Sequence, residues 1–388
     1  MWKPNALVAS IVTPSLPGFA HFLAPIVLIS AVSSASAEVP FLREGKAGFV
    51  VSDIRYVLAR DAAGTAACPQ GMSLNVSQVF ASTVEGQRRE GETDKDYAKR
   101  LEVGSRKMST APNGQNLCMN PEAGGPDPYF RTLNNPSGPA GLVAAPNRFS
   151  QVVGCTRSFQ STGPSNGFAT EMLTGSWGIL IELDQVQDIA NDTKVGVRFF
   201  ANADPIQLSA DRKPLAYASY AFDHDPRYRA STSGRIKNGV LTTNPVDIRF
   251  HDIVNGMHFV RPLRHAILQA TISANGSMTG YFAGYTPVEA MYDMQFGYRN
   301  GLTDSGRLAP LRLRLLTGNG AARVLGYTCP GAYQALYKYA DGDRDPKTNR
   351  YTSISTQYQI SAIPAFVVDI ATQSANAKLS DEASMHEQ

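Results

Sequence analysis

HAILQATISANGSMTGYFAGY, residues 265–285, is the segment that decides the fold class of this chain. Apolar and polar residues alternate on both sides of Asn275-Gly276, which is typical of strands with one buried face. Asn-Gly is also the dipeptide that the tight turn of a two-stranded hairpin favours most, because both residues tolerate a positive φ. The segment therefore predicts an antiparallel β-hairpin.

More strands are predicted before this hairpin. They lie in the segments 177–186, 193–203, 214–222 and 236–243, and the last of these, IKNGVLTT, contains a second Asn-Gly turn. Short strands separated by turns are typical of an antiparallel sandwich or barrel. We therefore predict a mainly β (α+β) protein with an antiparallel β domain over residues 170–286.

The region before this domain, residues 38–169, is predicted to be irregular and to contain cysteines. One strand is predicted in the segment 47–59, AGFVVSDIRYVLA, which is apolar and β-branched. One exposed helix is predicted over 91–107. Thr93 can cap its first turn, and the side chain of Asp96, three residues later, can form the reciprocal hydrogen bond back to the cap.

The region after the β domain, residues 287–371, is predicted to be helical or mixed. The segments 288–302 and 329–340 have helical spacing of apolar residues. The segment 363–371, IPAFVVDIA, is predicted to be a late strand or a segment that docks on the core. Residues 372–388 are polar and are predicted to form a disordered tail.

Residues 1–37 are predicted to be a signal peptide. Lys3 supplies a positive charge, residues 22–32 are apolar, and Ala35 and Ala37 give the small-x-small pattern of a cleavage site. The alternative is an N-terminal anchor that is not cleaved. A cleaved leader predicts a secreted or periplasmic protein without an integral membrane span.

The charge of the mature chain argues against nucleic acid as a partner. Removing 37 of 388 residues leaves 351, with 36 − 1 = 35 basic and 33 acidic residues, a net charge of +2. No basic stripe of the kind that binds nucleic acid is visible. The remaining partner classes are a small molecule, a glycan or a protein.

Four cysteines, Cys68, Cys118, Cys155 and Cys329, follow the leader. An even number in an exported chain predicts two disulfides, for which three pairings exist. We favour Cys68–Cys118 with Cys155–Cys329, because the first pair brackets one short segment.

Three alternating carboxylates, Asp341, Asp343 and Asp345, follow the second C-terminal helix. Carboxylates at positions 1, 3 and 5 resemble the start of a calcium-binding loop. Such a loop needs glycine at position 6 and glutamate at position 12, where this chain has Pro346 and Thr352. We therefore favour a solvated turn and keep a calcium ion as the alternative.

Three histidines in or near the β domain, His224, His251 and His258, are candidate ligands for a transition metal. His224 lies between two aspartates, and neutral imidazoles with carboxylates suit zinc, copper or iron. The alternative, which we favour, is that these histidines are scattered and hydrogen-bonded.

Aromatic residues crowd the region 217–298, with arginines nearby. Such a set is typical of a well-filled β core, which we favour, and also of a face that binds sugars or aryl groups. No motif of a serine hydrolase, a phosphate-binding loop or a zinc protease is present. We therefore predict an exported, non-catalytic binding or assembly protein that uses its β domain. The alternative is an extracytoplasmic hydrolase with a metal or carboxylate site in that domain.

Overall fold

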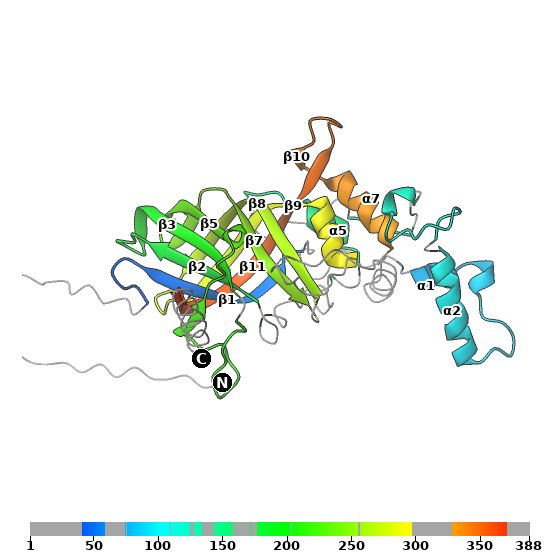
Figure 1. Ribbon diagram of the computed structural model, residues 1–388, viewed down its shortest axis with the longest axis horizontal. Coiled ribbons are helices and arrows are strands. Elements are labelled where there is room, and N and C mark those ends of the chain that lie inside the picture. Colours follow the sequence, from blue (N-terminus) through cyan, green and yellow to red (C-terminus); the bar gives the residue numbers. More distant parts are fainter. Residues whose placement is uncertain are drawn as a thin grey trace, which may run out of the picture. The chain divides into compact units, whose positions relative to one another are not determined.

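The computed structural model describes residues 41–58, 74, 76–108, 110–124, 127, 129–133, 142, 144–156, 159, 172, 177–202, 204–254, 257–296 and 328–370. These residues all fall within the unit Val39–Gln388, and Figure 1 shows their helices and strands. The strands are β1 (Ala47–Tyr56), β2 (Gly178–Asp184), β3 (Asn191–Asn202), β4 (Ala218–Ala221), β5 (Arg229–Lys237), β6 (Val240–Thr243), β7 (Val246–Val254), β8 (Met257–Ile272), β9 (Met278–Pro287), β10 (Gly342–Arg344) and β11 (Tyr351–Val368). The helices are α1 (Val76–Ala81), α2 (Asp94–Met108), α3 (Arg148–Val153), α5 (Val288–Phe296) and α7 (Cys329–Tyr339), with short 3-10 turns η1 (Val84–Gly86), η2 (Pro121–Ala123) and η5 (Pro226–Tyr228).

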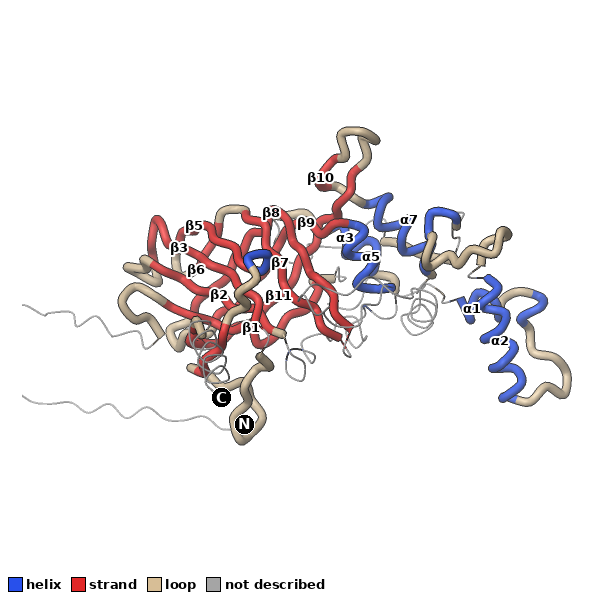
Figure 2. The backbone as a smooth tube through the Cα atoms, in the orientation of Figure 1, coloured by secondary structure: helices blue, strands red, loops and turns tan. Residues whose placement is uncertain are grey.

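All strands except β4, which pairs in parallel with the end of β11, form one antiparallel sheet that closes on itself. Its order is β1-β2-β3-β5-β6-β8-β9-β11, and β11 also pairs with β1 (Figure 2). Strand β7 follows β6 directly and pairs with the first half of β8, so that β6 and β7 together serve as one neighbour of β8. The predicted mainly β, antiparallel fold is confirmed, and its strands pair into a closed sheet.

Both Asn-Gly turns lie where the sequence predicts them. Asn238 and Gly239 have φ of 52° and 73° and connect β5 to β6. Gly276 has φ of 82° in the longer turn between β8 and β9. Glycine is needed there because a positive φ strains most other residues.

The interior of the closed sheet is filled by side chains. Phe199 of β3 and Phe282 of β9 are not on neighbouring strands, yet their rings lie 5.7 Å apart in an edge-to-face contact. The buried core around them includes Phe49, Val51, Ile179, Ile181, Leu183, Val195, Val197, Leu241, Leu268, Met278, Tyr358 and Ile360. A closed sheet of this size has just enough room for such packing.

The sheet extends beyond the predicted boundaries 170–286 of the β domain. Strand β1 comes from the region 38–169, and β11 comes from the region 287–371. The two strands pair from Phe49↔Pro364 to Tyr56↔Tyr358, over more than 300 residues of intervening chain. Strand patterns are local, so they identify each strand but not a partner at such a separation.

The helices α3, α5 and α7 contact the sheet near β8, β9 and β11 (Figure 1). A disulfide between Cys118 and Cys329 joins the N-terminal region to the start of α7, so both favoured pairings, Cys68–Cys118 and Cys155–Cys329, are wrong. Cys155 is also disulfide-bonded, whereas Cys68 lies outside the described residues. No helix in the described parts of the chain is long and apolar enough to cross a membrane.

A buried ion pair lies inside the fold where β7, β8, β1 and β11 meet. Arg261 and Asp252 are only 4% and 3% exposed, and Nη2 of Arg261 donates to Oδ2 of Asp252 at 2.7 Å. Nη1 of Arg261 donates to the hydroxyls of Tyr56 and Tyr358 at 2.7 and 3.2 Å. These bonds compensate the guanidinium for the water that it loses on burial.

We expect Asp252→Leu to lower the free energy of unfolding by about 3–5 kcal/mol, because Arg261 is left as an uncompensated buried charge. Urea unfolding followed by circular dichroism measures this loss. The double variant Asp252→Leu/Arg261→Met should recover most of it. Arg264→Gln, which removes a half-exposed ion pair with Asp343, is the control and should cost about 1 kcal/mol or less. Equal stability of Asp252→Leu and the wild type would contradict this account.

Candidate functional site

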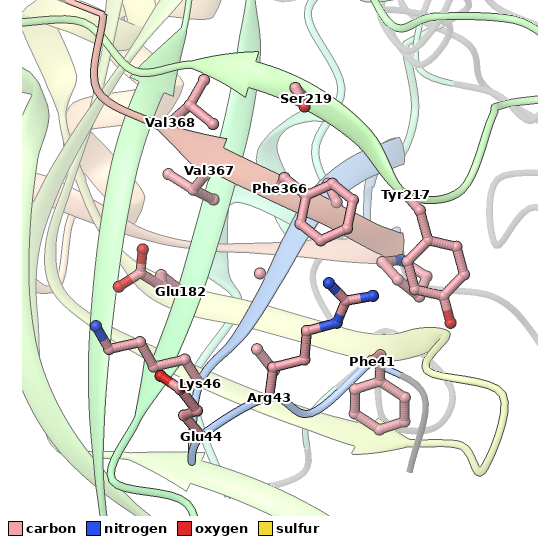
Figure 3. A pocket seen from close by; sticks show the side chains of 14 residues that line it. Phe41, Arg43, Glu44, Lys46, Glu182, Tyr217, Ser219, Phe366, Val367 and Val368 are labelled. Carbon is pink, nitrogen blue, oxygen red and sulfur yellow. The ribbon is translucent and has the colours of Figure 1, made fainter. Parts of the chain in front are cut away.

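A groove of about 470 Å³ lies on the outer surface, where the segment leading into β1 meets the end of β11. Its walls are the segment 41–48, residue 217 just before β4, residue 219 on β4, the end of β11 over 364–368, and Glu182 of β2 (Figure 3). This volume falls in the usual range of small-molecule sites, about 300–1,000 Å³. We call it the aromatic groove, after the rings of Phe41, Tyr217 and Phe366 that line it.

The end of β11 leaves the closed sheet to form one wall of the groove. Residues Ala365 to Val368 pair in parallel with β4, starting at Ala218↔Ala365. This wall passes so close to β1 that a Cβ on Gly48 would lie 2.5 Å from the carbonyl oxygen of Ala365. Glycine at position 48 is therefore required for the wall to sit where it does.

Tyr217 holds its ring in the groove at a cost in backbone strain. Its φ is 62°, a left-handed conformation that is unusual for a tyrosine. Its N–H donates to the carbonyl of Pro364 at 2.6 Å, which ties the residue to β11. Tyr217 and Phe366 are 40% and 37% exposed, with ring centroids 6.2 Å apart.

A tight turn brings two cations to the groove. Arg43 and Lys46 exchange both backbone hydrogen bonds, at 2.9 and 2.8 Å, around Glu44 and Gly45. Glu44 and Gly45 have φ of 50° and 73°, the signature of a hairpin turn with two left-handed residues. The guanidinium of Arg43 lies over the ring of Phe366, 5.4 Å from its centroid.

The acidic residues of the groove do not form ion pairs with its two cations. Glu182 forms an ion pair with Arg198 of β3, which also approaches Asp184 at 3.5 Å. Among the described residues, no carboxylate lies within ion-pair distance of Arg43 or Lys46. Figure 3 shows Lys46 and Glu182 at one end of the groove and Arg43 among the rings at the other.

The structure separates the candidate metal-binding histidines. Nε2 of His251 lies 2.6 Å from Oδ2 of Asp223, whereas Nε2 of His224 lies 3.0 Å from Oδ1 of Asp369. The side chain of His258 lies outside the described part of the structure. Within the part that is described, no three histidine, cysteine, aspartate or glutamate side chains converge in a way that could hold a metal ion.

The pair of His251 and Asp223 is partly covered. The ring of Tyr228 from η5 lies 4.0 Å from the imidazole, and the two paired side chains are 12% and 24% exposed. The hydrogen bond from His251 lowers the pKa of Asp223 below its usual value. The pair therefore fixes an imidazole beside a carboxylate that stays ionised.

The three alternating aspartates lie in a hairpin that joins α7 to β11. Asp341 accepts from the backbone N–H and the hydroxyl of Ser355, both at 2.8 Å. Asp343 accepts from Arg264 at 3.0 Å, and Asp345 accepts from the N–H of Lys347 at 2.8 Å. Their oxygens thus bind donors of the chain, and this geometry favours the turn over the calcium loop.

No family model matches this chain, and no curated protein or solved structure matches it either. The groove must therefore be interpreted from its own residues. Of these, Tyr217 falls in the aromatic-rich region 217–298, and nothing in the sequence gave a reason to choose Arg43, Phe366 or Lys46. Positive φ cannot be read from a tyrosine or a glutamate in a sequence.

The pKa of Asp223 predicts a specific loss of stability in acid. Because its folded-state pKa lies below the unfolded value of about 3.9, its contribution is complete above about pH 5 and is lost as the pH falls through the folded pKa. We expect Asp223→Asn to lower the free energy of unfolding above pH 5, and the gap to the wild type to shrink below pH 4. Urea unfolding at each pH measures the gap. Asp94→Asn, at a side chain that is 94% exposed, is the control. A gap that stays constant down to pH 2 would refute the assignment.

Proposed function

We propose that this chain is an exported carbohydrate-binding protein that holds a sugar ring in the aromatic groove. The observation that carries the proposal is the pair of exposed rings, Tyr217 and Phe366, at a groove of about 470 Å³ that also contains Arg43. Exposing a large aromatic ring to water costs free energy, and a bound ligand that covers the ring removes this cost.

Sugars suit such rings because a pyranose has one face of C–H groups. These hydrogens carry partial positive charge and pack on the negative face of an aromatic ring. The rim of hydroxyls then needs polar partners, which the groove offers in Arg43, Lys46, Glu44 and Ser219. A small-molecule site is usually lined by aromatic and apolar side chains with a small number of polar groups, as this groove is.

Export is supported by the leader-like sequence of residues 1–37 and by the disulfide between Cys118 and Cys329. Disulfides form and persist in oxidising compartments and are rare in the cytosol. An exported protein meets polysaccharides outside the cytoplasm, which agrees with the chemistry of the groove.

We expect isothermal titration calorimetry to detect binding of at least one tetrasaccharide from a set that includes cellotetraose, xylotetraose, tetragalacturonate and its methyl ester. Phe366→Ala should weaken that binding about tenfold, since a lost aromatic contact costs about 1.4 kcal/mol. Tyr217→Gly should weaken it as well, while leaving the midpoint of urea unfolding unchanged or higher, because glycine adopts a positive φ without strain.

The matched control is Tyr351→Ala, an aromatic residue that is 42% exposed and does not line the groove. It should bind the sugar as the wild type does. If no tetrasaccharide binds, or if all three variants bind equally well, the carbohydrate proposal is wrong.

A second candidate function is hydrolysis, and the pair of His251 and Asp223 favours it. A carboxylate that orients an imidazole is the usual support of a general base. In this candidate, Asp223 holds Nε2 of His251 at 2.6 Å, and the other ring nitrogen takes a proton from the attacking water or hydroxyl.

For this candidate we expect saturable hydrolysis of p-nitrophenyl acetate that His251→Gln abolishes and Asp223→Asn reduces by tenfold or more. His224→Gln is the control, because His224 binds a different aspartate, Asp369, and should keep the wild-type rate. Absence of hydrolysis, or a rate that survives His251→Gln, rules the candidate out.

A further inference from the structure

We infer that the aromatic groove selects sugars that carry a carboxylate, such as uronic acids, through Arg43 and Lys46. This inference rests on the proposed carbohydrate binding and specifies its substrate class. Three features of the described residues support it: the position of the two cations, the charge around them, and the orientation of Arg43.

The two cations lie directly opposite each other. Arg43 and Lys46 flank a two-residue turn as an antiparallel bridge, which places their side chains on the same face. Side chains in such a position have Cβ atoms about 5 Å apart, and like charges there destabilise the turn. Both side chains line the groove, so an anion bound there would reduce this repulsion.

The carboxylates of the groove do not form ion pairs with the two cations. Glu182 is paired with Arg198, which also approaches Asp184 at 3.5 Å. Glu44 lies within the turn and supplies one negative charge against the two positive charges of Arg43 and Lys46. The charges of the groove are therefore balanced in number, but among the described residues neither Arg43 nor Lys46 has a carboxylate within ion-pair distance.

The guanidinium of Arg43 is already held in place. It lies 5.4 Å from the centroid of the Phe366 ring, and a planar guanidinium on a ring keeps its N–H groups free for a second partner. Such a fork matches the two oxygens of a carboxylate. A sugar that packs on Tyr217 would therefore bring its carboxylate to Arg43, as the arrangement of these side chains in Figure 3 suggests.

The test compares tetragalacturonate with its methyl ester by calorimetry at about 20 mM and 200 mM salt. The ester keeps the size and stereochemistry of the acid and removes its charge. We expect the acid to bind about tenfold or more tightly than the ester at low salt, and the difference to decrease at high salt. Arg43→Gln and Lys46→Gln should each reduce the preference, with Arg43→Gln having the larger effect.

Arg55→Gln is the matched control, because Arg55 lies on β1, the strand that follows the turn, is paired with Asp53 and does not line the groove. Its preference for the acid should equal that of the wild type. Equal binding of acid and ester by the wild type, or an equal loss of preference in Arg55→Gln, overturns the inference and leaves carbohydrate binding in place. Failure of both ligands and of every other tetrasaccharide overturns carbohydrate binding itself.

Discussion

The pairing of β1 with β11 is the constraint on which the rest of the structure depends. It joins residues more than 300 positions apart and closes the sheet. It brings Tyr56 and Tyr358 to the same buried guanidinium, that of Arg261. It also places the segment 41–48 beside 364–368, so that the groove exists only when the sheet is closed. Closing a loop of this length is slow, because its entropy is lost before the contacts form.

The buried ion pair and the closed sheet support each other. Arg261 needs Asp252 and two tyrosine hydroxyls, and these partners come from β7, β1 and β11. A register error between β1 and β11 would remove the tyrosine hydroxyls. The N–H donors of the buried guanidinium would then lack hydrogen-bond acceptors. The polar cluster thus penalises the wrong pairing, which an apolar core of the same volume would tolerate.

The sequence predicted those parts of the fold that depend on local chemistry. The Asn-Gly turn at 238–239 and the cap of α2 at Thr93 each follow from a few neighbouring residues. The disulfide of Cys118 with Cys329 and the pairing of β1 with β11 were not predictable in this way, because any of several partners satisfies the same local pattern. The groove depends on that pairing, so no local pattern indicated that its residues would meet.

Three unfavourable features meet in the groove, and folding alone explains none of them. Tyr217 adopts a left-handed conformation, Arg43 and Lys46 bring two like charges to one groove, and Phe366 stays exposed. Left-handed residues also occur elsewhere, for example Arg212 and Asn349, but there no aromatic ring is held at a groove. Strain of this kind persists where the surroundings impose it, and it concentrates where a ligand binds. A bound acidic sugar would cover the rings and neutralise the cations, so one ligand would relieve two of the three costs at once.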